Sequence, residues 1–370
     1  MGDKTTILVT GVGSYWGAQV AARLLDRASS AVHGRQLTLD DLHVLGVDSV
    51  PPSMEIKDLD FIQTDLRNPL LKELFISEQV DMVCHLAFDD DPIPSEGSFD
   101  LNVMGTMKLL GACAEAGVKK VVLRSSTAVY GAKPTNPAFI TENHALYANH
   151  NHGAVRYLAE IETFCSGFRR QVPDMKLTIL RFASIIGLTV DTDLTKYLKQ
   201  PHVPVLLGFN PLMQVIHEKD VVEALVFALI NDRPGIYNVA AEGILPLKKL
   251  IALAGKPAFP VFHWFAYWGQ SLLEGHRGFD PFLPIGLDYI RYPWVADLNR
   301  MQDEMGFAPQ YTAEEALREF AHQQRLGKYL SIESARKLDE ERLRDILERR
   351  RRLRERQIIS SEDLDEGAIP

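Results

Sequence analysis

The sequence predicts an α/β fold with a doubly wound parallel sheet, a smaller C-terminal lobe and a charged helical tail. Short apolar runs of strand length recur at Thr6–Thr10, Val44–Asp48, Met82–Ala87, Lys120–Arg124 and Lys176–Arg181. Helical stretches separate them, at Gly17–Arg27, Leu70–Glu78 and Leu101–Ala116. Near-continuous apolar strands that alternate with helices are typical of a parallel sheet covered on both faces.

The domain organisation follows from where this alternation stops, near Ile186. We expect a first domain over residues 1–185, to which residues 212–245 return, and a second lobe over residues 186–330. Three elements are expected in the second half: a helix over Lys219–Ile230 that Asp220 caps, a strand over Ile236–Val239 and a last packed helix over Glu314–Gln324.

Residues 331–370 differ in kind from the rest of the chain. Arg336–Arg356 is dense in arginine and glutamate at spacings that allow i,i+4 ion pairs, which predicts an exposed helix paired with itself. A thin stripe of leucine and isoleucine also allows this helix to dock on the body or on a second copy. The sequence therefore leaves a homodimer open.

Composition excludes several classes of protein. The 370 residues have a formal net charge of -9, which argues against a general nucleic-acid binder. The three cysteines are widely spaced in apolar runs, which indicates small core residues in a reducing compartment. The sequence shows neither a signal-peptide pattern nor an apolar stretch long enough to span a membrane. We therefore expect a cytoplasmic protein.

A glycine-rich turn follows the first strand. Gly11, Gly13 and Gly17 stand between the run Thr6–Thr10 and the start of a helix. Glycine is needed where the backbone takes unusual dihedrals and approaches a pyrophosphate closely, and the helix start offers free N–H groups to the phosphates. The alternative is a tight turn with no ligand.

An acidic residue closes the second strand. Asp48 follows Val44–Val47, where a carboxylate accepts hydrogen bonds from the ribose hydroxyls of an adenosine and repels a 2′-phosphate. This favours NAD over NADP as cofactor. An insertion over Ser29–Asp41 makes the spacing from the glycines longer than usual, and the alternative is a solvated residue at a strand end.

Several segments, in order, resemble the extended short-chain dehydrogenases/reductases of the NAD-dependent epimerase/dehydratase group. They are the glycine spacing, Asp65-Leu66-Arg67, His85-Leu86-Ala87, Asn102–Thr106, Ser125–Gly131, Leu180–Gly187, Val215–Val221 and Gly235–Val239. The resemblance covers roughly residues 5 to 325 and implies a Rossmann sheet, a substrate lobe and a small-molecule substrate. It implies NAD contacts at Gly11, Gly13, Tyr15, Trp16, Gly17, Asp48, Asp65, Leu66, Leu86, Ala87, Asn102 and Arg156.

The catalytic pair of that family is changed here. The resemblance places the active-site hydroxyl at Ser126, and a Tyr-x-x-x-Lys pair about 25 residues later. In this register the sequence reads His152-Gly-Ala-Val-Arg156. Positions i and i+4 share a helix face, so both side chains still converge on one site. No metal site is expected.

Three functions remain open. In the first, an atypical oxidoreductase, epimerase or dehydratase acts on a sugar nucleotide, with His152 as acid/base and Arg156 as the cation on the ribose side that keeps His152 neutral. In the second, the chain is a catalytically inactive NAD-binding regulator or scaffold. In the third, it reduces an apolar, isoprenoid- or sterol-like substrate.

The lobe is rich in aromatic residues at Phe262–Trp268 and Phe279–Trp294. They would build the core of the lobe, because aromatic side chains supply much of the area that a core buries. Alternatively, they line an apolar substrate pocket or touch a membrane surface.

Overall fold

The computed structural model describes most of the chain. The described residues are 4–26, 30–32, 35–37, 42–52, 54–91, 93–147, 153–273, 286–329, 340 and 343–344. The tail predicted over residues 331–370 lies almost wholly outside them. The chain divides into two compact units, Met1–Arg318 and Glu319–Pro370.

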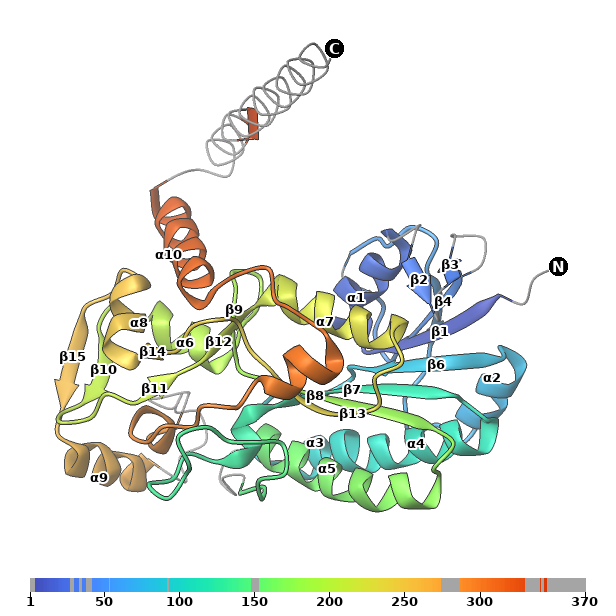
Figure 1. The fold of residues 1–370 in the computed structure, drawn as a ribbon, viewed down its shortest axis with the longest axis horizontal. Helices are drawn as coiled ribbons and strands as arrows, with labels where there is room; N and C mark the ends of the chain where they lie inside the picture. Colours follow the sequence, from blue (N-terminus) through green and yellow to red (C-terminus); the bar gives the residue numbers. More distant parts are fainter. Residues whose placement is uncertain are drawn as a thin grey trace, which may run out of the picture. The chain divides into compact units, whose positions relative to one another are not determined.

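A seven-stranded parallel sheet forms the centre of the first unit (Figure 1). In spatial order its strands are β13 (Gly235–Val239), β8 (Lys176–Phe182), β7 (Lys120–Ser126), β6 (Val80–His85), β1 (Thr5–Thr10), β4 (Leu42–Asp48) and β5 (Asp60–Gln63). The chain leaves β1 toward β4 on one side and later returns to β6 on the other. The sheet is doubly wound, which confirms the predicted fold class, and ligands bind at such a reversal of strand order.

Helices cover both faces of the sheet. Helices α1 (Tyr15–Asp26) and α7 (Glu218–Ile230) pack on one face with Ile7 and Val9 of β1. Helices α2 (Leu71–Ser77), α4 (Gly105–Ala116) and α5 (Gly153–Gln171) pack on the other face with Leu8. Successive side chains of a strand point to opposite faces, so an apolar run in β1 serves both cores.

Shorter helices connect these elements. They are α3 (Glu96–Phe99), two 3-10 turns at Thr127–Tyr130 and Asp288–Ile290, and two π-helical turns at Asp100–Met104 and Arg300–Met305. Helix α10 spans Ala313–Tyr329.

The small lobe lies beyond β8 and consists of two-stranded sheets and short helices. The pairs are β9 (Ser184–Ile186) with β12 (Val215–His217), β10 (Val203–Leu206) with β15 (Ala258–Val261), and β11 (Leu212–Met213) with β14 (Leu245–Pro246). Its helices are α6 (Asp193–Lys199), α8 (Leu247–Leu253) and α9 (His263–Leu273). The boundary expected near residue 185 falls inside the first unit and stays a prediction.

One local expectation needed correction. Asp220 does not cap α7: its buried carboxylate accepts the N–H groups of Gln310 and Tyr311 at 2.8 and 3.1 Å, and the cap is His217, whose ring accepts from Lys219 N. The insertion before β4 contains a hairpin, β2 (Ser30–Val32) with β3 (Arg35–Leu37), which leaves the pairing of β4 with β1 intact.

The aromatic residues of the lobe divide into two groups. Tyr289 and Trp294 are buried, as expected of a core. Phe262, Trp264, Phe265 and Trp268 are exposed instead, whereas Tyr267 is partly buried, so most of the core expectation for this segment is wrong.

Candidate active site

The glycine loop leaves no room for side chains. Gly11 has φ +77°, and a Cβ there would lie 2.7 Å from the backbone of Leu86 and Ala87. A Cβ on Gly17 would lie 2.2 Å from the carbonyl oxygen of Gly11, so only glycine lets α1 start this close to the strand. The tight approach places the N-terminus of α1 at the sheet edge, where it attracts phosphate.

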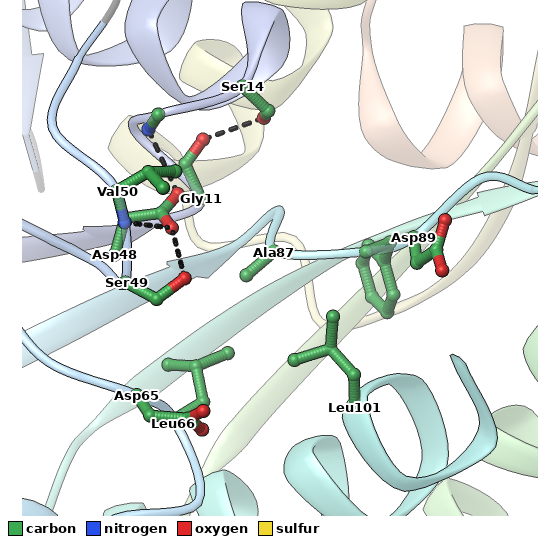
Figure 2. A pocket seen from close by; sticks show the side chains of 12 residues that line it. Gly11, Ser14, Asp48, Ser49, Val50, Asp65, Leu66, Ala87, Asp89 and Leu101 are labelled. Carbon is green, nitrogen blue, oxygen red and sulfur yellow. Dashed lines mark hydrogen bonds between the residues drawn. The ribbon is translucent and has the colours of Figure 1, made fainter. Parts of the chain in front are cut away.

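Asp48 is held in place by the same loop. Its Oδ2 accepts the N–H of Gly13 at 2.9 Å, and its Oδ1 accepts the N–H of Val50 at 3.2 Å (Figure 2). The side chain is half-buried at the carboxyl end of β4, with room on its carboxylate for further donors. This geometry fits a carboxylate that binds the two hydroxyls of a ribose.

A pocket of about 210 Å³ opens beside this carboxylate. It is lined by Gly11, Gly13, Ser14, Asp48, Ser49, Val50, Asp65, Leu66, Ala87, Phe88, Asp89 and Leu101. Six of the positions expected to contact NAD therefore line one cavity: Gly11, Gly13, Asp48, Asp65, Leu66 and Ala87. Glycine backbone, a ribose-type carboxylate and an apolar floor are what the adenosine half of NAD requires.

Asp65 has a further role in the structure. Both carboxylate oxygens accept hydrogen bonds from Arg67, at 2.5 to 2.9 Å, and Arg67 also binds Asp100. The Arg67 hydrogen bonds lower the pKa of Asp65 to about 2. Asp65 is therefore ionised and fixed at the pocket wall, with its neighbour Leu66 buried behind it.

The loop after β6 is built by two buried polar side chains. Thr10 accepts the N–H groups of Leu86 and Ala87 at 3.0 and 3.3 Å and bonds the ring of His85 at 2.8 Å. Burial lowers the pKa of His85 to about 3, so its ring is neutral at physiological pH. Both hydrogen-bonding groups of the Asn102 amide are used by the backbone of Asp89, at 2.8 Å each. Asn102 thus positions the pocket wall.

Tyr15 and Trp16 turn away from this pocket. Trp16 is buried in the core between the sheet and α7, edge-on to Tyr15 at 5.0 Å between ring centroids. Burial raises the pKa of Tyr15, whose hydroxyl lies close to Thr189 and to Glu218, the first residue of α7. Neither side chain lines the pocket, so contact of these two residues with NAD stays a prediction.

The catalytic edge lies at the carboxyl end of β7 and the start of α5. Ser126 is half-buried there, and its Oγ accepts the N–H of Ala128 at 3.1 Å. Arg156 lies on α5, and its Nε donates to Glu160 one turn later at 2.9 Å. His152 lies outside the described residues, directly before the first residue of α5. The pairing of His152 with Arg156 therefore stays a prediction.

The other tyrosines of this region are engaged elsewhere. Tyr157 is buried, and its hydroxyl binds the backbone of Ser95 at 2.9 to 3.0 Å. Tyr147 is exposed, with Lys133 Nζ 3.5 Å from its ring centroid.

The sequence analysis did not predict a buried ion pair that lies between α5 and the ends of β7 and β8. Arg181 and Glu162 are 3% and 2% exposed, and two guanidinium nitrogens bind the carboxylate. Ser125 donates to the same carboxylate at 2.5 Å, and Arg181 donates to Tyr130 at 2.6 Å. The network joins α5 to β7 and β8, so it fixes the helix on which Arg156 lies relative to Ser126.

The sequence analysis also did not single out Arg124 as a residue of the site. Its guanidinium lies 5.8 Å from the ring centroid of Trp16 and 5.7 Å from that of Phe88, and one nitrogen binds both oxygens of Asp90 at 2.8 Å. Its side chain is 11% exposed, and its buried Nε has no partner in the described part of the chain. The sequence did contain a sign of this residue, because Arg124 is a charged residue that ends an apolar strand directly before Ser125.

These features define a dinucleotide-binding protein with a second, smaller lobe. The family model described as "NAD dependent epimerase/dehydratase family" matches residues 7–240. An uncharacterized protein of Mycobacterium tuberculosis is 33% identical over 322 residues, which cover 85% of this chain and 82% of that protein. The chain belongs to the NAD-dependent epimerase/dehydratase family, and NAD is its cofactor.

Two named proteins extend the comparison. UDP-glucose 4-epimerase 2 of Oryza sativa subsp. japonica is 31% identical over 196 residues, 50% of this chain and 46% of that protein. The structure of Thermus thermophilus UDP-glucose 4-epimerase in complex with NAD aligns at a TM-score of 0.64, with 20% identity, over 87% of this chain and 99% of that chain. At that identity the structural match confirms the fold.

Among the described residues, no helix has the length and apolar character needed to cross a bilayer. The same residues contain no group of three His, Cys, Asp or Glu side chains placed to hold a metal ion. The exposed aromatic rings of α9 are not among the residues that line the cofactor pocket.

Proposed function

We propose that the chain is an NAD-dependent enzyme that oxidises a hydroxyl of a nucleotide sugar, with His152 as the acid/base. The observation that supports this most directly is the presence of two features in one chain: a pocket beside Asp48 that fits an adenosine, and Ser126 at the end of β7, a strand that α5 contacts. Two of the similar proteins are the UDP-glucose 4-epimerases of Oryza sativa subsp. japonica and Azospirillum brasilense, which supports a nucleotide sugar as substrate.

The residues divide the work as follows. The glycine loop and Asp48 bind NAD, which accepts and can return a hydride when bound. Ser126 donates a hydrogen bond to the reacting oxygen of the substrate, and the neutral ring of His152 accepts the proton of that hydroxyl. Arg156 orients the nicotinamide ribose and disfavours a charged ring at His152.

The test uses the full chain with added NAD and a panel of UDP- and dTDP-sugars. Product formation is followed by NMR, because epimerisation leaves no net change in NADH absorbance. We expect turnover of at least one sugar nucleotide and its loss in His152→Ala. The proposal fails if a substrate is found that His152→Ala turns over at the unmodified rate.

A second candidate is an NAD-binding regulator without turnover. The observation that favours it is the engagement of Arg156 by Glu160, which draws the guanidinium along its own helix. An inactive chain that gains turnover in the double variant His152→Tyr/Arg156→Lys would establish this alternative.

The proposal includes the compartment, the kind of substrate and the oligomeric state. We propose a protein of the cytoplasm that acts on a small molecule. Light scattering of the purified chain tests whether it forms a homodimer.

A further inference from the structure

Helix α9 has its aromatic face on the outside. Trp264, Phe265 and Trp268 are 58%, 50% and 65% exposed, and their spacing of three and four residues places them on one side of the helix. The rings of Trp264 and Phe265 stack at 3.9 Å between centroids. A surface helix normally turns its apolar stripe toward the core.

Tyr267 and His263 of the same helix contact other parts of the lobe. Tyr267 donates to the carboxylate of Asp288 at 2.5 Å, and the ring of His263 lies 6.0 Å from that of Phe209. Tyr267 is partly buried. Among the described side chains of the helix, the large apolar ones are those that the protein leaves exposed.

The exposed surface continues onto the neighbouring strands. Phe259 on β15 and Phe262 after it are each 54% exposed. Leu207, 47% exposed, lies beside them because its N–H donates to the carbonyl of Val261 at 2.8 Å. We name this surface the aromatic patch; it consists of Leu207, Phe259, Phe262, Trp264, Phe265 and Trp268. Contiguous apolar surface of this kind marks an interaction site.

The two segments that carry the patch contain lysines but no acidic residue of their own. Residues 194–217 and 243–273, which pair through β10 with β15 and β11 with β14, contain five lysines and neither aspartate nor glutamate. The whole chain is at -9. Figure 1 shows α6, α8, α9, β10 and β15 gathered at one end of the first unit, on the left.

The five lysines are Lys196, Lys199, Lys248, Lys249 and Lys256. Lys196 pairs with Asp191 at 3.7 Å, and Lys256 donates to the carbonyl of Lys199 at 3.4 Å. Lys199 pairs with Asp191 at 3.3 Å, and Lys249 pairs with Glu314, in ion pairs whose side chains are 39% to 66% exposed. Exposed pairs contribute little and exchange readily.

We propose that the aromatic patch docks on the surface of an anionic lipid bilayer, with α9 lying in the plane of the interface. Tryptophan and phenylalanine bury their rings at the level of the headgroups, and lysines around them bind lipid phosphates. Helix α9 has 11 residues, too few to span a bilayer, so the attachment is peripheral. A second copy fits less well, because a two-fold interface would bring the same lysines face to face.

The test is flotation of the full chain with vesicles of phosphatidylcholine alone and of phosphatidylcholine mixed with phosphatidylglycerol. We expect binding to the mixed vesicles that weakens as salt is raised. Tryptophan emission should shift to the blue on binding, since Trp264 and Trp268 are exposed while Trp16 and Trp294 are buried.

Variants assign the binding to the patch. Trp264→Ser/Trp268→Ser should weaken partitioning by roughly tenfold or more, because two large rings lose their burial in the interface. Lys248→Glu/Lys256→Glu should reduce the preference for anionic vesicles. Ile76→Ser removes an equally exposed apolar side chain, on α2, and should change nothing.

Three results would overturn the proposal. They are failure to bind either vesicle, equal binding by the tryptophan double variant, and a dimer in light scattering that the double variant dissociates while vesicle binding is absent. The last result would assign the patch to a second copy. Each readout is independent of turnover.

Discussion

The two halves of the site differ in what holds them. In the cofactor half, hydrogen bonds between side chains and backbone fix the groups: the N–H groups of Gly13 and Val50 hold the Asp48 carboxylate, and the Thr10 and Asn102 side chains hold the loop after β6. In the catalytic half, the supporting network of Glu162 and Arg181 is complete, while the residues at positions 152 and 156 have changed type. The difference indicates that the scaffold constrains where chemistry occurs and leaves the choice of acid/base to a few side chains.

The largest expected effect separates the two halves directly. His152→Ala should lower kcat by about 10²–10⁴-fold, the usual contribution of an acid/base, while the Kd for NAD stays unchanged. In the unmodified protein the histidine must be neutral to accept a proton. Activity should therefore be present above a pH near ~6.5 and fall as pH decreases through that value.

Titration calorimetry with NAD and a pH–rate profile check this prediction together. A flat profile through neutrality, or a loss of NAD affinity equal to the loss of kcat, would remove the distinction between the halves.

The network under the catalytic half gives the next effect. Glu162→Ala leaves the buried guanidinium of Arg181 without its carboxylate, which should cost about 3–5 kcal/mol of the free energy of unfolding. Denaturant unfolding measures it. The control is Glu160→Ala, which breaks the exposed pair with Arg156 and should cost at most about 1 kcal/mol. Equal costs for the two variants would contradict the structure.

A substitution in the cofactor half should change the preference for NAD over NADP. Asp48→Ala removes two hydrogen-bond acceptors for the ribose and the charge that repels a 2′-phosphate, so the NAD:NADP affinity ratio should fall by at least about tenfold. Calorimetry with both cofactors measures the ratio. Asp65→Ala is the comparison, because Arg67 already occupies that carboxylate, and the ratio should change less. Equal affinity of the unmodified protein for both cofactors would refute the assignment of Asp48.

The smallest effect is expected at Arg124, on the border between the halves. Its guanidinium lies over Phe88, which lines the pocket, and beside Trp16 at the start of α1, so its charge reaches the place of the phosphates. Arg124→Ala should weaken NAD binding about threefold to tenfold. Asp90→Asn, which removes the competing carboxylate, should strengthen it slightly. The same sign of change in both variants would exclude this role.

Much of this architecture could be predicted from the sequence. The five strands β1, β4, β6, β7 and β8 were each expected from a short apolar run, because a strand covered on both faces must be apolar throughout. Strand β5 was missed, since an edge strand is only partly buried and its run is weak. The glycine loop was predictable because its backbone geometry admits no other residue.

The site was predictable to a smaller extent. The sequence identified Asp48 and Ser126, and the structure places them at the ends of β4 and β7. It also suggested that Asn102 touches the cofactor, whereas its amide binds the backbone of Asp89. A motif reports which residue is present but not which of several nearby partners it binds.

By itself, then, the sequence determined the doubly wound sheet and the glycine loop, because each depends on residues close together in the chain. The replacement of the Tyr-Lys pair by His152 and Arg156 stays a prediction. Only the tertiary structure decided that Glu162 binds Arg181, that Asp220 binds the backbone at residues 310 and 311, and that the rings of α9 face outward. Those outcomes depend on which segments approach after folding. Polar and aromatic side chains accept many partners, and the approach of distant segments selects among them.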